Sequence, residues 1–299
     1  MRGYIALDVG GTQIKPWLIT DQGRIARRPA FYPAHAQEER ETLLAHFCTI
    51  LSDARREAER LGLALAGVGM AFPGPFDYDR GVCLMRGIGK YDSLYGLELG
   101  AYFTQRFPGL PFRFANDADL FGLGEYHFSP DAASFRAAAP SPARVLYLGI
   151  GTGIGSCFLE DGRLVKNRAD VPAHGWVYHT PFRDGIADQY LSARGLMRQA
   201  TRFPALAAIA DPKALCAAAR EGLPDAQQAV SAFGAVLAEA AAPFAERFLA
   251  QRIVVGGQVA KDFDLYSAPL ARYCETTDRR LDCCPESSMY AALGVAKLF

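Results

Sequence analysis

Tyr4-Ile-Ala-Leu-Asp-Val-Gly-Gly-Thr-Gln-Ile-Lys-Pro-Trp-Leu-Ile19 is the stretch that decides the fold of this chain. An apolar run that ends at Asp8 predicts a buried strand, and a second run from Ile14 to Ile19 predicts the return strand of a hairpin. We expect Gly10 and Gly11 to make the reversal, because glycine alone enters positive φ without a steric cost. Such a turn gathers several backbone N–H groups, so it predicts a phosphate-binding loop. An ordinary hairpin, in which the glycines serve only the turn, is the alternative.

Polar side chains stand on both sides of this turn. Asp8 places a carboxylate where a Mg²⁺ ion can be held directly or through water. Thr12 adds a hydroxyl group, and Gln13 begins the return strand. These residues are the first candidates for a nucleotide-phosphate site.

A second copy of this plan lies halfway along the chain, at residues 145–164. An apolar strand runs into a set of alternating glycines and another strand leads out; the glycines are Gly149, Gly151, Gly153 and Gly155. The segments that follow the two predicted hairpins also match, with Asp-Gln-Gly-Arg-Ile at 21–25 and Glu-Asp-Gly-Arg-Leu at 160–164. Repetition at this distance predicts two related α/β domains, each presenting a phosphate loop to a shared cleft.

The composition is typical of a globular protein and argues against several classes of partner. The chain has 299 residues, 50% of them hydrophobic and 21% charged, and its formal net charge is zero. A zero net charge gives no support for binding to nucleic acid or to an anionic membrane surface. The sequence contains no apolar run of 18 residues and no signal-peptide pattern, so we expect a cytoplasmic protein. The seven cysteines lack C-x-x-C spacing, which favours free thiols, including the adjacent pair Cys283 and Cys284.

Further polar residues stand at predicted strand ends between the two glycine turns. A strand at 63–72 stops at the rigid loop that contains Gly74, and a strand at 111–115 delivers Asn116 and Asp117 to its carboxyl end. Ligand residues of α/β folds commonly lie at the carboxyl ends of strands. Asn116 and Asp117 are therefore candidates for the site.

The remaining elements follow from periodicity, glycine and proline. We predict strands at 24–31 and 252–255, a surface connection at 129–144, a structured loop at 170–185, and helices at 38–61, 97–107, 118–128, 190–202, 212–220, 225–250 and 286–299. Pro243 is expected to kink the helix at 225–250. We expect residues 1–117, completed by the terminal helix, to form one domain and residues 118–285 to form the other.

Five motifs occur in a fixed order: Asp8-x-Gly-Gly-Thr12, Gly74-Pro75, Asn116-Asp117, Gly151-Thr-Gly-x-Gly155 and Gly256-Gly257. With this set the chain resembles, over nearly its whole length, the ROK family of bacterial sugar kinases in the actin/hexokinase superfamily. The resemblance implies an α/β fold of two ribonuclease-H-like domains that close on ATP and a sugar. It also suggests a homodimer.

The resemblance assigns roles residue by residue. Asp117 matches the catalytic base of the family. The implied sugar contacts are Asn116, Gly74, Trp176, His179 and Asp188. The implied ATP contacts are Asp8, Gly10, Gly11, Thr12, Gln13, Gly151, Thr152, Gly153, Gly155, Gly256 and Gly257, and Asp8 would also serve Mg²⁺. Gln258 stands where the family often has a third glycine.

One segment departs from the family pattern, and it concerns the sugar. Gly175-Trp-Val-Tyr-His179 aligns with the family's G-E-I-G-H, so Trp176 stands where a Glu normally binds sugar hydroxyls. Trp176 is either a packing residue or a platform for the apolar face of a sugar. Asp188 stands where the family has another sugar-binding Glu, and capping of the following helix is its alternative role. His179 is kept, and a metal pair with His174 is the less favoured interpretation of it.

The segment after His179 also lacks the family's C-x-C-G-x-x-G-C zinc loop, as in the zinc-free bacterial glucokinases that it resembles. We therefore expect no structural zinc.

Together these residues predict ATP-dependent phosphorylation of a hydroxyl group on a hexose or a hexose-like molecule. Asp117 would accept the proton of the hydroxyl as it attacks the γ-phosphate in line. A sugar-responsive transcriptional regulator is one rival, but the first loop begins within the first dozen residues and leaves no room for a preceding helix-turn-helix. A degenerate kinase that binds ligand without turnover is the other rival, suggested by Trp176. The sequence leaves the sugar and the phosphorylated hydroxyl open.

Overall fold

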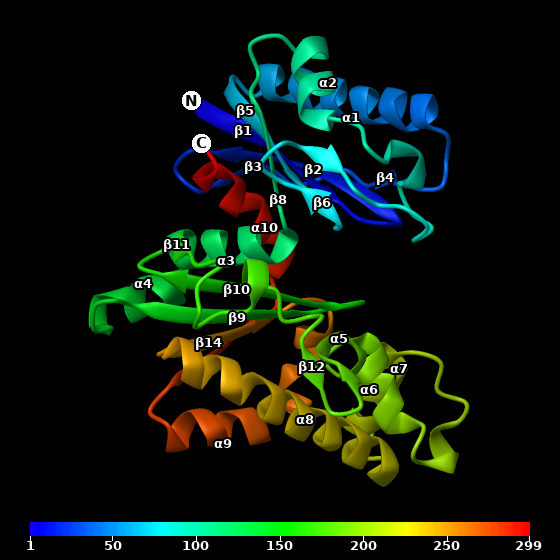
Figure 1. Cartoon of the computed structure of the whole chain (residues 1–299), viewed down its shortest axis with the longest axis vertical. Helices are drawn as coiled ribbons and strands as arrows, with labels where there is room; N and C mark the ends of the chain where they lie inside the picture. Colours follow the sequence, from blue (N-terminus) through cyan, green and yellow to red (C-terminus); the bar gives the residue numbers. More distant parts are fainter. The chain divides into compact units, whose positions relative to one another are not determined.

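The structure is a computed structural model that describes every residue from Met1 to Phe299. The chain forms two units, and each consists of a β-sheet with helices (Figure 1). The first unit comprises Met1–Ala133 and Ser288–Phe299, and the second comprises Ser134–Ser287. The predicted α/β class is confirmed.

The sheet of the first unit is built on the predicted hairpin. β1 (Arg2–Val9) pairs antiparallel with β2 (Gln13–Thr20) and parallel with β5 (Ala64–Ala71). β5 pairs parallel with β8 (Phe112–Ala115). Two short strands, β3 (Ile25–Arg27) and β4 (Tyr32–Pro33), both pair with β2, which gives the order β3-β2-β1-β5-β8 with β4 beside β2.

The second sheet repeats this order strand for strand. β9 (Arg144–Ile150) and β10 (Ile154–Glu160) form an antiparallel hairpin that β11 (Arg163–Leu164) extends. β14 (Arg252–Gly256) pairs parallel with β9, and β15 (Arg280–Cys284) pairs parallel with β14. The order β11-β10-β9-β14-β15 matches β3-β2-β1-β5-β8 in the direction of every strand. The duplication that the two glycine turns indicate is therefore present in the fold.

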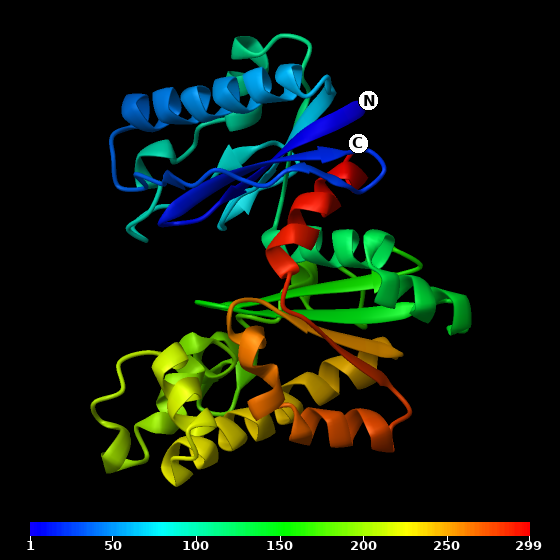
Figure 2. The ribbon, with the colours of Figure 1, turned by 180° about the vertical axis from the view of Figure 1, so that it is seen from behind.

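The first sheet is covered on both faces. Successive side chains along a strand point to opposite sides, so each strand contributes residues to two cores. On β1, Ile5 and Leu7 belong to a core that α1 (Arg40–Arg60) and α2 (Leu99–Arg106) complete. Tyr4 and Ala6 belong to a core on the other face, with α10 (Ser287–Gly294) and η5 (Val295–Lys297). In Figure 2, α1 lies on one side of this sheet and the C-terminal segment on the other.

Helix α3 (Asp117–Phe128) belongs to the first unit, and this moves the domain boundary. A Cβ atom added to Gly124 would lie 1.7 Å from the Tyr290 carbonyl oxygen, and one added to Gly294 would lie 2.0 Å from the Leu120 carbonyl oxygen. α3 and α10 therefore approach backbone to backbone, which requires glycine at the contact. The first unit accordingly continues through residue 133, whereas the sequence had suggested an end at residue 117.

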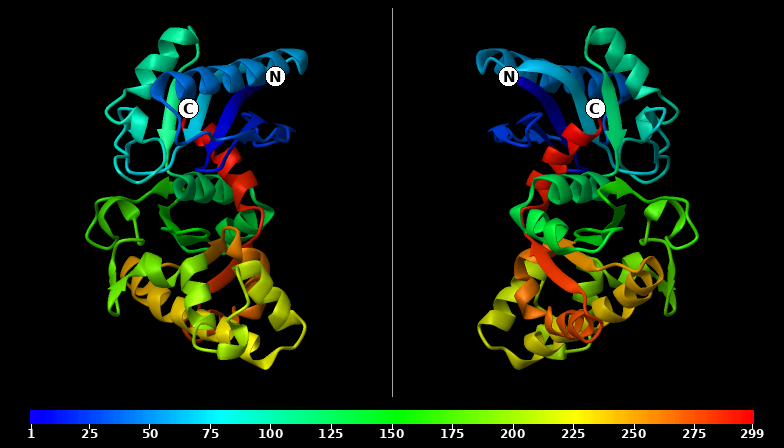
Figure 3. Two further views of the ribbon diagram at one scale, coloured as in Figure 1. Left: turned by 90° about the vertical axis from the view of Figure 1, so that its right-hand side faces the viewer. Right: turned by 90° about the vertical axis from the view of Figure 1, so that its left-hand side faces the viewer.

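Helix α8 (Pro224–Phe248) forms the centre of the second core and runs unbroken through Pro243. It packs with β9, β10 and β14 and with three further helices: α6 (Ala193–Ala200), α7 (Pro212–Arg220) and α9 (Ala268–Thr276). Figure 3 shows these helices on one side of the second sheet. By length and composition α8 is the one helix that could cross a membrane. Half of its most apolar window is buried in the unit, as in the core helix of a globular protein.

The segment at 129–144, predicted as a surface connection between the halves, does contain the boundary between the units, at Ala133 and Ser134. The sequence missed that much of it is helical, because helix α4 (Pro130–Ala138) lies there. Pro130 opens the helix, where the missing N–H costs nothing, and the Asp131 N–H donates to Ser129 Oγ at 3.2 Å. The alanines that suggested a linker are strong helix formers. Two predicted elements are also shorter than expected: the strand at 24–31 is confined to β3, and the helix at 190–202 is preceded by a separate turn, α5 (Ala187–Tyr190).

Short elements complete the two units. β6 (Phe76–Asp77) pairs with β7 (Val82–Cys83), and β12 (Pro181–Phe182) pairs with β13 (Gly185–Ile186). The remaining helical turns are η1 (Asp92–Leu94), η2 (Ala173–Gly175), η3 (Pro204–Leu206) and η4 (Val259–Leu265).

Candidate active site

Strand register brings the two predicted acidic residues to one edge of the first sheet. Asp8 on β1 is paired with Ala71 on β5, and Ala71 is paired with Ala115 on β8. Asn116 and Asp117 follow Ala115 directly, where β8 passes into α3. The carboxyl ends of parallel strands share one edge of a sheet. Asp8 and Asp117 therefore lie at the same edge, although the chain separates them by most of the first unit.

Asn116 caps helix α3 and is held by its side chain. Its Oδ1 accepts a hydrogen bond from the Ala118 N–H at 3.0 Å, and its Nδ2 donates to Tyr78 Oη at 3.5 Å. The Tyr78 hydroxyl donates to the Phe72 carbonyl at 2.9 Å. A Cβ added to Gly74 would lie 3.5 Å from the same hydroxyl oxygen. Tyr78 thus joins the Gly74 loop to the end of β8.

Asp117 is an acid whose pKa is raised by its surroundings. The first cause is burial of the carboxyl group by the surrounding protein, which removes water from it and disfavours its charged form. The second cause is the negative charge of Asp8. Two N–H groups, from Ala118 and from Asp117 itself, lower the pKa, as does the ammonium group of Lys90. Asp117 is nevertheless an exposed residue, so a small molecule can reach its carboxylate.

Asp8 forms an ion pair with Lys15 across the hairpin. The two residues are register partners on β1 and β2, and Lys15 Nζ lies 3.2 Å from Asp8 Oδ2. No group of three or more His, Cys, Asp or Glu side chains in the chain could hold a metal ion. A Mg²⁺ ion binds through one or two carboxylates and takes its other oxygens from water and phosphate. The donor set at Asp8 fits such an ion.

The first glycine turn is held by Tyr91. The Gly10 N–H donates to the Gln13 carbonyl, and the Ala34 N–H donates to the Thr12 carbonyl, both at 2.9 Å. The hydroxyl of the buried Tyr91 donates to the Gly10 carbonyl at 2.8 Å, and burial raises the pKa of this hydroxyl. The Tyr91 hydroxyl therefore fixes the backbone of the turn.

The reason predicted for the glycines of this turn is wrong. Neither Gly10 nor Gly11 has a positive φ. Space is the actual constraint at Gly10, because an added Cβ would lie 2.9 Å from the Gln13 carbonyl oxygen.

The second glycine turn is tied to α5 and α6. The Gly151 carbonyl accepts from the Ala193 N–H at 2.8 Å. Asp188 Oδ1 accepts from the Ile154 N–H at 2.9 Å, and its Oδ2 is paired with Arg194. A Cβ added to Gly153 would lie 2.7 Å from Asp188 Oδ1. Both carboxylate oxygens of Asp188 are therefore engaged in bracing the turn that contains Thr152, while its predicted sugar contact stays a prediction.

Gly256 and Gly257 lie at the same edge of the second sheet as this turn. Gly256 is paired with Gly149, and Gly257 has a φ of +94°. A Cβ added to Gly257 would lie 2.3 Å from the Ile150 carbonyl oxygen. Its N–H donates to Ser287 Oγ at 3.0 Å. Here both the positive φ and the close approach require glycine.

Trp176 lies in a row of aromatic rings on the second unit. Its ring centroid is 4.7 Å from that of His174 and 6.0 Å from that of Tyr178, and Tyr178 is 4.8 Å from His179. Ser156 on β10 fixes the backbone on both sides of Trp176, because its Oγ donates to the Gly175 carbonyl at 2.7 Å and accepts from the Val177 N–H at 2.9 Å. The indole N–H of Trp176 is shielded from solvent and has no hydrogen-bond partner.

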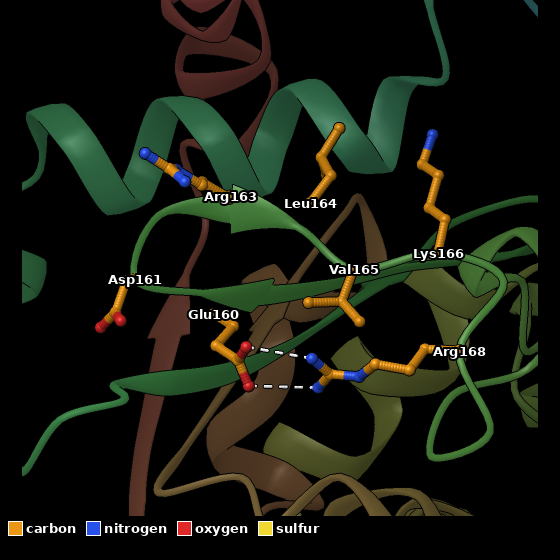
Figure 4. A pocket seen from close by; sticks show the side chains of 7 residues that line it. All are labelled: Glu160, Asp161, Arg163, Leu164, Val165, Lys166 and Arg168. Atoms are coloured by element: carbon orange, nitrogen blue, oxygen red, sulfur yellow. Dashed lines mark hydrogen bonds and ion pairs between the residues drawn. The ribbon is translucent and has the colours of Figure 1, made fainter.

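A hollow on the second unit contains none of the predicted site residues. Figure 4 shows the residues that line it: Glu160, Asp161, Arg163, Leu164, Val165, Lys166 and Arg168. Arg168 donates to both oxygens of Glu160, at 3.0 and 3.1 Å, and these bonds lower the pKa of Glu160. Glu160 also accepts from Arg144. Arg144 and Arg168 are therefore both paired with Glu160, and these ion pairs have a structural role.

Sequence reasoning missed four side chains that the fold brings to the turns and loops of the candidate site: Lys15, Tyr78, Tyr91 and Ser287. Lys15 could have been found, because hairpin register places it opposite Asp8. The other three carry no local signal, since each contacts a turn or loop that only the tertiary structure brings near.

Two sheets of the same strand order, each with a glycine turn after its first strand, make a fold that is similar to that of a ROK hexokinase from Thermus thermophilus, with 22% identity, a TM-score of 0.76, and coverage of 99% of this chain and 98% of that one. The family model described as "ROK family" matches residues 4–288, and the chain belongs to this family. It is 26% identical over 263 residues to an N-acetylmannosamine kinase of Salmonella typhimurium, a match that covers 85% of this chain and 82% of that protein.

Two further solved structures share the fold. One is a ROK family glucokinase from Streptomyces griseus in complex with glucose and AMPPNP, with 22% identity, a TM-score of 0.75, and coverage of 99% of this chain and 98% of that one. The other is a ROK family transcriptional regulator, a homologue of the E. coli MLC protein, with 17% identity and a TM-score of 0.80. That match covers 99% of this chain and 78% of the regulator.

Proposed function

We propose that this protein is an ATP-dependent kinase that transfers the γ-phosphate to a hydroxyl group of a hexose or a hexose-like molecule. The observation that carries the proposal is the placement of Asp117, an exposed carboxylate with a raised pKa, at the same sheet edge as Asp8 and the first glycine turn. Membership of the ROK family and the similarity to N-acetylmannosamine kinases support it.

Asp117 would act as the general base. Its Oδ1 accepts from the Ala118 N–H at 2.9 Å, which leaves Oδ2 to face a sugar hydroxyl. The hydroxyl proton passes to this carboxylate as the sugar oxygen bonds to the γ-phosphorus and the bond to the β-phosphate oxygen breaks. A raised pKa makes the carboxylate a stronger base than an ordinary aspartate. Asn116, fixed by its capping hydrogen bonds, would orient the sugar beside it.

The phosphates would be bound by backbone N–H groups and Asp8. In the first unit the contacts would come from Gly10, Gly11, Thr12 and Gln13. In the second they would come from Gly151, Thr152, Gly153, Gly155, Gly256 and Gly257. A Mg²⁺ ion, held by Asp8 directly or through water, would offset the negative charge of the phosphates. Lys15 would keep the Asp8 carboxylate oriented through the 3.2 Å ion pair.

The aromatic row around Trp176 would set the choice of sugar. A flat indole ring offers the apolar C–H face of a sugar a surface to stack on. His179, at the end of the row, and Gly74 would complete the sugar contacts. We further propose a cytoplasmic location, a homodimer, and no structural zinc.

A panel of acceptors with ATP and Mg²⁺ tests the proposal. The panel contains glucose, mannose, N-acetylglucosamine, N-acetylmannosamine and several polyols, and ADP formation is the readout. Acceptor-dependent ADP formation by the wild type, lost in Asp117→Asn, is the expected result. Binding of an acceptor and ATP without transfer would favour the degenerate kinase instead.

A further inference from the structure

Lys90 is a cation at the first glycine turn that the scheme above leaves without a role. It ends the run Arg86-Gly-Ile-Gly-Lys90 and is half-buried. A Cβ added to Gly11 would lie 3.6 Å from Lys90 Cδ. The aliphatic part of Lys90 therefore lies against the turn that we assign to phosphate.

The loop that carries Lys90 is fixed to this turn. Asp92 accepts from the Ile88 N–H at 3.2 Å and from the Gly89 N–H at 3.0 Å, which closes the loop on itself. The next residue, Tyr91, is buried and donates its hydroxyl hydrogen bond to Gly10. Because its neighbour is bonded to the turn, Lys90 holds a defined position beside it.

The charge of Lys90 is uncompensated, in contrast to that of the other lysine at this edge. Lys15 is paired with Asp8 at 3.2 Å, whereas the Lys90 ammonium group makes no ion pair or hydrogen bond. Its charge reaches Asp117, whose pKa it lowers. An ammonium group without an ion-pair partner, carried beside a phosphate turn and near enough to a base to lower its pKa, is suited to an anion that binds at this edge.

We propose that Lys90 contacts the γ-phosphoryl group of bound ATP while that group is transferred to the sugar. This inference rests on the proposed function. The ammonium group would offset charge on the non-bridging oxygens of the phosphoryl group, and it forms no covalent bond. ADP lacks the group that Lys90 binds, so the contact distinguishes ATP from ADP.

The test compares the binding of AMPPNP with that of ADP by calorimetry in the presence of Mg²⁺. Lys90→Met removes the charge and keeps the aliphatic chain, Lys90→Gln is a second charge-removing variant, and Lys90→Arg restores a cation. Arg86→Met is the matched control, because Arg86 belongs to the same loop but places its guanidinium over the Tyr95 ring. Loss of a charge-assisted hydrogen bond predicts that Lys90→Met and Lys90→Gln bind AMPPNP about ten-fold more weakly and bind ADP as the wild type does. Lys90→Arg should recover most of the difference, and Arg86→Met should change neither affinity.

The same variants are then assayed for transfer with the best acceptor of the panel. In Lys90→Met, kcat should fall at least about ten-fold. The acid limb of its pH profile should move to higher pH, since Asp117 then faces the negative charge of Asp8 without the opposing charge of Lys90. This shift follows from the charge of Lys90 near Asp117 alone, so the ratio of AMPPNP to ADP affinity decides whether Lys90 contacts the γ-phosphoryl group.

The outcomes distinguish the role proposed for Lys90 from the kinase activity proposed for the whole protein. An unchanged ratio of AMPPNP to ADP affinity in Lys90→Met overturns the role of Lys90, whether or not the wild type transfers phosphate. An effect confined to the KM of the acceptor overturns it too, and assigns Lys90 to an anionic group on the sugar. A wild type that binds AMPPNP and transfers nothing contradicts the kinase proposal alone, and the affinity ratio still decides Lys90. A wild type that binds neither nucleotide contradicts both.

Discussion

Replacement of Asp117 by Asn is the sharpest test of the chemistry proposed here. Asn has nearly the same shape, and its side-chain oxygen can still accept the hydrogen bond that Ala118 N–H donates to Asp117 Oδ1 at 2.9 Å. The amide cannot take a proton from a sugar hydroxyl. The substitution therefore removes the base and keeps the local geometry of α3.

The expected loss of rate follows from what a general base supplies. Proton transfer to a positioned base is typically worth about 10²–10⁴ in rate, so kcat should fall by at least about two orders of magnitude. AMPPNP affinity should stay close to that of the wild type, because the role proposed for Asp117 is a contact with the sugar and not with the nucleotide.

Stability should not fall with activity. A pKa raised in the folded state means that the folded protein holds this proton more tightly than the unfolded chain, so ionisation of Asp117 at neutral pH costs stability. Asn removes this cost together with the repulsion from Asp8. The Tm of Asp117→Asn at neutral pH should equal or exceed that of the wild type, and the difference should shrink as the pH falls through the raised pKa.

The assay combines ADP formation with the best acceptor, calorimetric titration of AMPPNP, and thermal unfolding followed by circular dichroism. Turnover of Asp117→Asn within a few-fold of the wild type would refute the role of Asp117 as the base. A lowered Tm would refute the electrostatic argument, even if the activity were lost.

Three further results are expected. The rate of wild-type transfer should fall on acidification at a pH above the range of an ordinary aspartate, because Asp117 must be ionised and its pKa is raised; a pH profile of kcat with an acid limb at the ordinary value would contradict this. Tyr91→Phe removes the hydrogen bond to the Gly10 carbonyl, so it should lower the free energy of unfolding in urea by about 0.5–1.5 kcal/mol and weaken AMPPNP binding, and unchanged values of both would dismiss Tyr91 as an anchor of the turn. Glucose should be a poor acceptor, because Trp176 stands where the family resemblance implies a carboxylate partner of sugar hydroxyls and an unpaired polar group costs about 1–3 kcal/mol; glucose as the best acceptor of the panel by a wide margin would rule this out.

The sequence by itself determined the elements whose signals are local. The hairpins β1–β2 and β9–β10 were predictable because apolar strands flank a glycine turn within a few residues. The same holds for α7, predicted at 212–220 and found at Pro212–Arg220, where proline opens a short amphipathic helix. The position of Asn116 and Asp117 at a carboxyl edge also followed, since a parallel strand ends just before them.

Only the tertiary structure decided which side chains meet at the turns. The Tyr91 hydroxyl reaches Gly10 across 81 residues of chain, and Asp188 reaches the Ile154 N–H across 34. It also placed α3 in the first unit, through backbone contact between Gly124 and the C-terminal helix. Such contacts arise from the packing of elements that are distant in sequence, and no periodicity or turn residue encodes them locally. For the same reason the glycines of the first turn were predictable but the reason for them was not: the Gln13 carbonyl lies close to Gly10, and neither glycine has a positive φ.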